Sequence, residues 1–121
     1  MQDFRSLKIW KRAHVLTLMI YKVSLSFPKE ETYSLASQLR RSIISVPANI
    51  AEGAGRNTKP DFAQFLNIAL GSLNESIYYI LLAKELDYLK DEDYLMLERE
   101  MNELKAMLIA FISAVRKSVV S

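Results

Sequence analysis

Apolar residues recur every three or four positions along most of the chain, a spacing typical of amphipathic helices. The first helix is predicted from Ser6 to Ser26 and the second from Tyr33 to Arg56. A third begins after "NTKPD", where Pro60 suits the first turn, and a fourth follows "YLKDED", whose acidic residues suit the positive end of a helix. No alternating run of apolar and polar residues is bounded by turn residues, so no strand is expected.

One apolar stripe on each helix predicts a shared core, and Thr32 and Thr58 are the expected caps of the second and third helices. The stripes are Ile9, Ala13, Leu16, Ile20, Val23 and Phe27; Ala36, Leu39, Ile43, Val46, Ile50 and Ala54; Phe62, Leu66, Ala69, Leu73, Ile77 and Ile80; and Leu97, Met101, Leu104, Leu108, Phe111 and Val115. Four helices of about 20 to 28 residues with short connections predict an all-α, up-down-up-down four-helix bundle. Residues 1–121 are expected to form this one domain.

The first helix carries a second apolar stripe, which we call the second stripe and which lies about 140° around the helix from the first. Its residues are Leu7, Trp10, Leu18, Tyr21 and Leu25. A helix of a monomeric bundle needs only one apolar face, so the second stripe favours a homo-oligomer. His14, the one histidine, lies on the same side, and packing at an interface is expected there because a single histidine cannot build a zinc site.

The composition narrows the class of protein. The chain has no cysteine, which rules out disulfides and thiolate metal sites. The N-terminus lacks a signal-peptide pattern, and no stretch of about 18 apolar residues is free of charges, so a cytoplasmic protein without a membrane partner is expected.

Charge is distributed unevenly between the two halves of the chain. Residues 1–60 carry ten Lys and Arg against four Asp and Glu, whereas residues 61–121 carry six against ten. One interpretation is that complementary helices pack against each other or against neighbouring subunits; the other is that the basic half binds nucleic acid. The candidate nucleic-acid-binding residues are Lys8, Lys11, Arg12, Lys22, Arg40, Arg41, Arg56 and Lys59.

The segment "SVPANIAEGAGRN" places helix breakers inside the second helix. Pro47 has no N–H, so the carbonyl of Ile43 loses its helical donor and a kink is expected. Gly55 is expected to supply the left-handed residue that ends the helix. One face of this helix carries polar residues, among which Glu52 and Arg56 have the spacing of an ion pair. These residues are Arg41, Ser45, Asn49, Glu52 and Arg56.

Two interpretations of this polar face remain open. It either forms structural hydrogen bonds, buried or between subunits, or it binds a ligand. No nucleophile, histidine or carboxylate pair accompanies it, and a Gly-x-Gly without a preceding strand is not a phosphate loop. No catalytic residue, metal or cofactor is therefore expected, and the protein is not expected to be an enzyme.

The stretches "SQLRRSIISVPANIAEGAGRN" and "FAQFLNIALGSLNES" resemble the four-helix bundle family of proteins encoded in intervening sequences of bacterial 23S rRNA genes. The matching positions are Ser45, Pro47, Asn49, Ile50, Ala51, Glu52, Gly53, Gly55 and Arg56 in the first stretch, and Phe62, Phe65, Leu66, Ala69, Gly71, Ser72, Leu73 and Glu75 in the second. The opening "FRSLKIWKRAHVL" is also similar, and the chain departs from the family pattern at Ile77, where many members are acidic.

The resemblance implies a bundle that assembles as a ring, with five subunits the expected number. It also implies kinship with the accessory variability protein of diversity-generating retroelements, which binds nucleic acid and a reverse transcriptase. Two functions follow as hypotheses. The first is a nucleic-acid-binding accessory protein with RNA, DNA or a reverse transcriptase as partner; the second is a protein-interaction scaffold without a nucleic-acid role.

Overall fold

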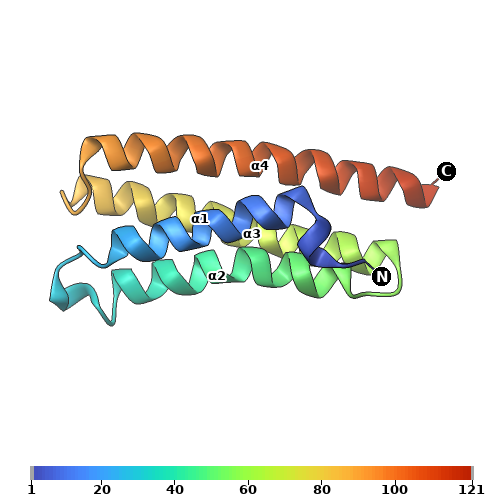
Figure 1. The fold of residues 1–121 in the computed structure, drawn as a ribbon, viewed down its shortest axis with the longest axis horizontal. Helices are drawn as coiled ribbons and strands as arrows, with labels where there is room; N and C mark the ends of the chain where they lie inside the picture. The colour runs from blue at the N-terminus through green and yellow to red at the C-terminus, as the bar shows by residue number, and fades with distance from the viewer. Residues whose placement is uncertain (1, 121) are drawn as a thin grey trace.

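The computed structural model describes residues 2–120, with side chains through Ser118, and these residues form four long antiparallel helices (Figure 1). The helices are α1 (Lys8–Ser24), α2 (Leu35–Ala54), α3 (Lys59–Glu85) and α4 (Asp91–Val120), with short 3-10 helices η1 (Phe4–Ser6) and η2 (Lys29–Glu31). No strand is present between residues 2 and 120. The prediction of an all-α four-helix bundle is confirmed.

Each helix packs against two others, and consecutive helices are neighbours. α2 and α3 make the most extensive contact of the four neighbouring pairs, and α1 and α4 make the least extensive. The N-terminus lies at the end where α2 passes into α3, because the amide of Gln2 donates to the carbonyl of Ala54 at 2.8 Å (Figure 1).

The predicted stripes form the core. Every residue predicted for α2 is buried, and so are all those of α3 except Ile77, which is half-buried. On α4 the stripe turns near its end, so Ile112 is buried while Phe111 and Val115 are half-buried. The rotation follows from the 3.6-residue repeat, which drifts slowly relative to any fixed spacing of apolar residues.

The helix ends confirm one predicted cap and correct the other. Thr58 caps α3 as expected, since its hydroxyl accepts from the amide of Asp61 at 3.3 Å. Thr32 does not cap α2; the helix begins after Ser34, and the carboxylate of Glu31 accepts from the amide of Leu35 at 3.3 Å. The carboxylate of Glu31, one turn before Leu35, reaches the first amide of α2, whereas the hydroxyl of Thr32 does not.

Gly55 is not left-handed, contrary to prediction. Its φ of −83° lies in the ordinary helical region, and its amide donates to the carbonyls of Ala51 and Glu52. The helix α2 therefore ends without a left-handed residue. The left-handed residue lies elsewhere, at Asp87 with φ 62°, in the turn between α3 and α4. Aspartate adopts this conformation more readily than most side chains.

Pro47 lies inside α2 without ending it, and the helix runs through to Ala54. The hydroxyl of Thr17 on α1 bonds to the carbonyl of Ala13 at 2.8 Å and lies 3.4 Å from the carbonyl of Ile43. A polar group of the neighbouring helix thus faces the acceptor that the proline leaves without a helical donor.

α3 is long and apolar enough, by length and composition, to cross a membrane. The core helix of a bundle has the same composition, and α3 packs against both α2 and α4. Its fully enclosed residues include Leu66, Leu73 and Ile80. The core accounts for only part of the hydropathy of α3, because 28% of the apolar window is buried and Ile68, Tyr78 and Leu81 are exposed.

Candidate functional site

The polar residues of the "SVPANIAEGAGRN" segment lie where α2 and α3 approach each other closely. A Cβ placed on Gly53 would lie 2.9 Å from Phe62 Cδ1 and 2.9 Å from Phe65 Cβ. Distances this short leave no room for a side chain, so Gly53 lets the backbone of α2 pack directly on the aromatic residues of α3.

Serine hydroxyls join the two helices at two levels. The buried pair Ser42 and Ser76 lie 2.8 Å apart, and Ser45 and Ser72 lie 2.8 Å apart one turn further along α2. Asn49 extends the second level, since its side-chain amide donates to the carbonyl and to the hydroxyl of Ser45, at 2.8 Å each. No described buried side-chain nitrogen or oxygen lacks a partner.

Above the serine pairs lies an open polar depression of about 330 Å³, which we call the α2–α3 groove. It is lined by Gln38, Arg41, Ser42, Ser45, Ser72 and Glu75. Glu75 is exposed, and its carboxylate accepts from the hydroxyl of Tyr79 at 2.7 Å, a bond that raises the pKa of Tyr79 above its ordinary value. Because Glu75 is exposed, water solvates its carboxylate and no arginine partner is needed.

The end of α2 is fixed to α3 by Arg56. The predicted pair is present, with Arg56 donating to Glu52 at 2.9 Å, and both side chains are about half exposed. The guanidinium also stands over the ring of Phe65 with 4.6 Å to the ring centre. An exposed ion pair of this spacing contributes only about 0.3–0.5 kcal/mol, so the aromatic contact matters at least as much here.

Gly71 lies at the middle of the exposed face of α3, and a Cβ placed there would meet nothing within 4 Å. Packing within the chain therefore explains Gly53 but not Gly71.

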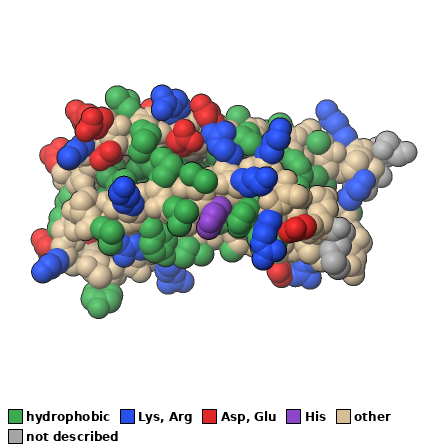
Figure 2. Space-filling view, in the orientation of Figure 1, with side chains coloured by type: hydrophobic (Ala, Val, Ile, Leu, Met, Phe, Trp, Pro, Cys, Tyr) green, Lys and Arg blue, Asp and Glu red, His purple; other side chains and the backbone are tan. Residues whose placement is uncertain are grey.

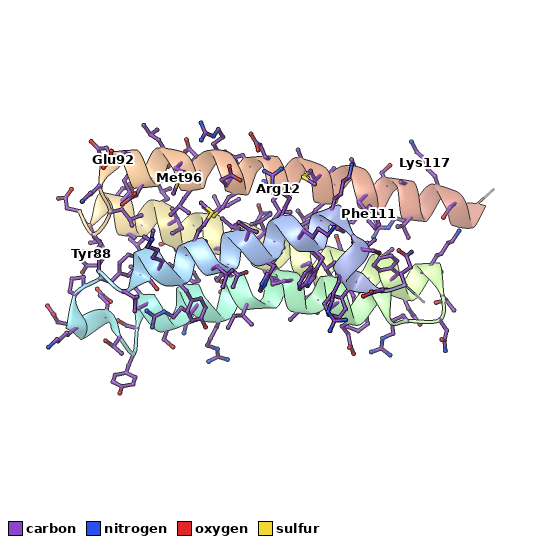
Figure 3. All side chains as sticks on the ribbon, in the orientation of Figure 1. Arg12, Tyr88, Glu92, Met96, Phe111 and Lys117 are labelled. Carbon is purple, nitrogen blue, oxygen red and sulfur yellow. The ribbon has the colours of Figure 1, made fainter. Side chains whose placement is uncertain are left out.

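Three of the arginines predicted to bind nucleic acid are engaged in contacts within the chain: Arg56, described above, Arg12 and Arg40. Arg12 points from α1 toward α4 and donates to Glu103 at 2.7 Å and to Glu100 at 3.1 Å (Figure 3). Both carboxylates raise the pKa of Arg12, the hydrogen bond to Glu103 most strongly. Arg40 donates to Ser24 at 2.9 Å and stands over the ring of Tyr21.

The other candidates face solvent without a carboxylate partner in the part of the chain that the structure describes. These are Lys8, Lys11, Lys22, Arg41 and Lys59. Lys8, Lys11 and Lys22, which we call the lysine column, share one side of α1. Figure 2 shows Lys and Arg side chains gathered toward the end of the bundle where α1 begins, with acidic ones over the start of α4.

The second stripe of α1 is partly covered in the single chain: Leu7 and Trp10 are half-buried, whereas the other three residues, Leu18, Tyr21 and Leu25, are exposed. Leu18 is 58% and Leu25 78% exposed. His14 is exposed beside them and stacks on Trp10 with the ring centres 4.9 Å apart, and Figure 2 shows it among hydrophobic side chains. An apolar depression of about 480 Å³ lies between the start of α1, including Leu7 of the second stripe, and Met107 and Phe111 of α4.

The groove offers hydrogen bonds and charge. Its inner hydroxyls bond to carbonyls and to one another, so none of them is held by a general base. Such an arrangement can position a polar ligand or a partner's side chains.

Fold and site together define a small antiparallel four-helix bundle with a polar face between its second and third helices. The profile of the 23S rRNA-intervening sequence protein family matches residues 5–110, and the chain belongs to this family. Among solved structures, the chain is similar to a protein of unknown function from the S23 ribosomal protein family of Bacteroides thetaiotaomicron. The two are 27% identical, with a TM-score of 0.77, over 86% of this chain and 97% of that one. No curated protein matches the sequence.

The sequence predicted only part of the groove. Ser42 and Ser76, the deepest hydroxyls, were absent from the candidate residues, as were Gln38 and the partners of Arg12 on α4. A signal was present in the spacing, since Ser42 and Ser45, and likewise Ser72 and Ser76, lie three or four residues apart at the edge of an apolar stripe.

Proposed function

We propose that the protein is a non-enzymatic, homo-oligomeric accessory protein that binds nucleic acid through a basic surface on α1. The observation that carries the proposal is the lysine column, whose ammonium groups face solvent without ion-pair partners among the described residues. The chain's membership of a family named for 23S rRNA intervening sequences supports a nucleic acid as the partner.

Self-association is part of the proposal because it would multiply a modest charge. The second stripe is adjacent to the lysine column, so burying the stripe between subunits would leave the lysines at the edge of the interface. A ring, with five subunits as the expected number, repeats each lysine contact and gives avidity.

The binding test uses fluorescence anisotropy with labelled duplex DNA and RNA. Contacts to phosphates predict binding at about 50 mM salt that weakens steeply as salt rises, with a log–log slope of about −0.9 per phosphate neutralised on duplex DNA. The triple variant Lys8→Gln, Lys11→Gln, Lys22→Gln should reduce both the affinity and this slope. Lys29→Gln, Lys90→Gln, Lys117→Gln is the control of equal charge on other surfaces. Equal loss in both triple variants would contradict a specific role for the column.

The assembly test is light scattering at micromolar concentration, which should report several times the chain mass of 13.9 kDa. Leu18→Asp should split the assembly, because a buried unpaired charge costs several kcal/mol. Ile109→Asp, on an exposed position of α4, is the matched control. A monomeric native protein would refute the oligomer.

A protein-interaction scaffold is the second candidate, and the exposed part of the second stripe, Leu18, Tyr21 and Leu25, favours it. An intact oligomer that binds neither DNA nor RNA at about 50 mM salt would make it the better function.

A further inference from the structure

The α2–α3 groove has no role in the proposed nucleic-acid binding, yet it collects polar groups that the chain leaves unsatisfied. Its rim carries one cation, Arg41, and one anion, Glu75, from opposite helices. The two form no ion pair with each other, and Arg41 has no hydrogen-bond partner within the described residues. The only described partner of the Glu75 carboxylate is the Tyr79 hydroxyl.

The Ser45–Ser72 pair that lines the groove has one hydroxyl proton without an acceptor among the described residues. Ser45 accepts from Asn49 and shares one hydrogen bond with Ser72. Two hydroxyls carry two protons, and their shared bond uses only one. Whichever serine donates, the other's O–H has no acceptor among the described residues and is free to donate into the groove.

The opposite charges of Arg41 and Glu75 favour a ligand that carries both a positive and a negative group. An inorganic anion on Arg41 would lie in a groove that also holds the carboxylate of Glu75, and a simple cation on Glu75 would meet the guanidinium of Arg41. A molecule with both charges satisfies both side chains, and its carboxylate can also accept the spare serine proton.

We propose that the α2–α3 groove binds a small zwitterion of the α-amino acid class, with its carboxylate on Arg41 and the Ser45–Ser72 pair and its ammonium on Glu75. The volume of about 330 Å³ lies at the small end of ligand sites, which span about 300–1,000 Å³. The groove is open and polar, so affinity comes from charge-assisted hydrogen bonds with little apolar burial, and millimolar dissociation constants are expected.

The test uses the native assembly and saturation-transfer difference NMR, a method suited to weak ligands of large particles. Glycine, L-alanine and L-glutamine are the probes. N-acetyl-L-alanine, which lacks the ammonium, and L-alanine amide, which lacks the carboxylate, are matched controls. The proposal expects saturable binding of at least one probe, with each control binding at least about tenfold more weakly than L-alanine.

Variants assign the binding to the groove. Arg41→Gln and Glu75→Gln should each weaken it by about tenfold or more, since each removes one charge-assisted contact. Both positions are exposed, and the amide introduced by Glu75→Gln keeps an oxygen that can accept from Tyr79, so melting temperatures should stay unchanged. Arg99→Gln and Glu92→Gln, at exposed positions of α4, make the same charge changes away from the groove and should bind as the native protein does.

Three results would overturn the proposal: no saturable signal from any probe up to about 20 mM, equal binding of the zwitterions and their one-charge derivatives, or equal effects of the groove and control variants. None of these bears on the lysine column, so the two proposals fail independently.

Discussion

The contact between α2 and α3 differs in kind from the contact between α1 and α4. α2 and α3 meet through a glycine, buried serines and apolar residues, and they make the most extensive contact in the bundle. α1 and α4 make the least extensive contact, bridged by the long side chain of Arg12, with an open apolar depression beside it. We call these two contacts the α2–α3 seam and the α1–α4 seam. The backbones approach closely in the α2–α3 seam, whereas the long side chain of Arg12 connects the helices of the α1–α4 seam.

The difference shows where the family motif acts. The motif residues Ser45, Gly53 and Ser72 lie on the α2–α3 seam, where small size and hydroxyl groups determine how closely the helices can pack. Gly71 lies outside it, on the exposed face of α3. The α1–α4 seam depends on side chains that have room to move, so it should tolerate changes that the α2–α3 seam does not.

The largest contrast is expected between the two motif glycines. Gly53→Ala should destabilise the fold by about 1–3 kcal/mol, because its Cβ would overlap Phe62 and Phe65. Gly71→Ala meets open space and should stabilise α3 by about 0.5–1 kcal/mol, since glycine is a poor helix former. Urea denaturation of both variants measures the difference; similar midpoints would show that the close approach at Gly53 carries no energetic weight.

Removing a buried hydroxyl should have a smaller effect. Ser42→Ala takes away one member of the Ser42–Ser76 pair, and we expect a loss of about 1 kcal/mol, because Ser76 keeps its bond to the Ser72 carbonyl. Ser37→Ala, a half-buried position of α2 outside the seam, is the control. Thermal melting should separate the two, and an unchanged Ser42→Ala would contradict a structural role for the hydroxyl pair.

The α1–α4 bridge should contribute less still. Arg12→Gln loses the contacts to Glu100 and Glu103, but the side chain is 39% exposed, so the expected cost is about 0.2–1 kcal/mol. The difference from the native protein should shrink in high salt. A cost above that of Gly53→Ala would reverse the ranking of the two seams.

The smallest effect is expected for the pH dependence of stability, through Glu31 in the connection between α1 and α2. Hydrogen bonds from Ser34, Tyr88 and the amide of Leu35 lower the pKa of Glu31 below its ordinary value of 4.5. A lowered pKa means that the stabilisation is fully present above the ordinary value and is lost as pH falls through the lowered one. Glu31→Gln should therefore reduce the drop in Tm between neutral and strongly acidic pH, while Glu30→Gln, its exposed neighbour, should not.

The sequence predicted the helices and most of the core because burial of a helix face depends on a local repeat. Periodicity alone placed Leu39, Ile43 and Leu66 inside. The helix ends were less predictable, because the capping group of α2 came from Glu31, outside the helix, and because the left-handed turn residue was Asp87 rather than Gly55.

The site was predictable only on one helix at a time. Wheel geometry grouped Ser45 with Asn49, and i, i+4 spacing gave the Glu52–Arg56 pair. The pairing of Ser42 with Ser76, or of Arg12 with Glu103, depends on how helices far apart in sequence align along the bundle axis, and no local pattern contains that information. The Arg12 bridge also supports the interpretation that some of the charge asymmetry between the chain halves serves packing.

The two serine pairs limit how far α2 can slide along α3. An apolar helix interface can shift by one turn, about 5.4 Å, and find its ridges and grooves matched again. Hydroxyls at two levels reduce this degeneracy. A one-turn shift could pair only one hydroxyl from each helix, Ser42 with Ser72 or Ser45 with Ser76, and would leave Ser76 or Ser42 buried without the other serine. The pairs thus favour one position of α2 along α3, and with it the relative height of Arg41 and Glu75 in the groove.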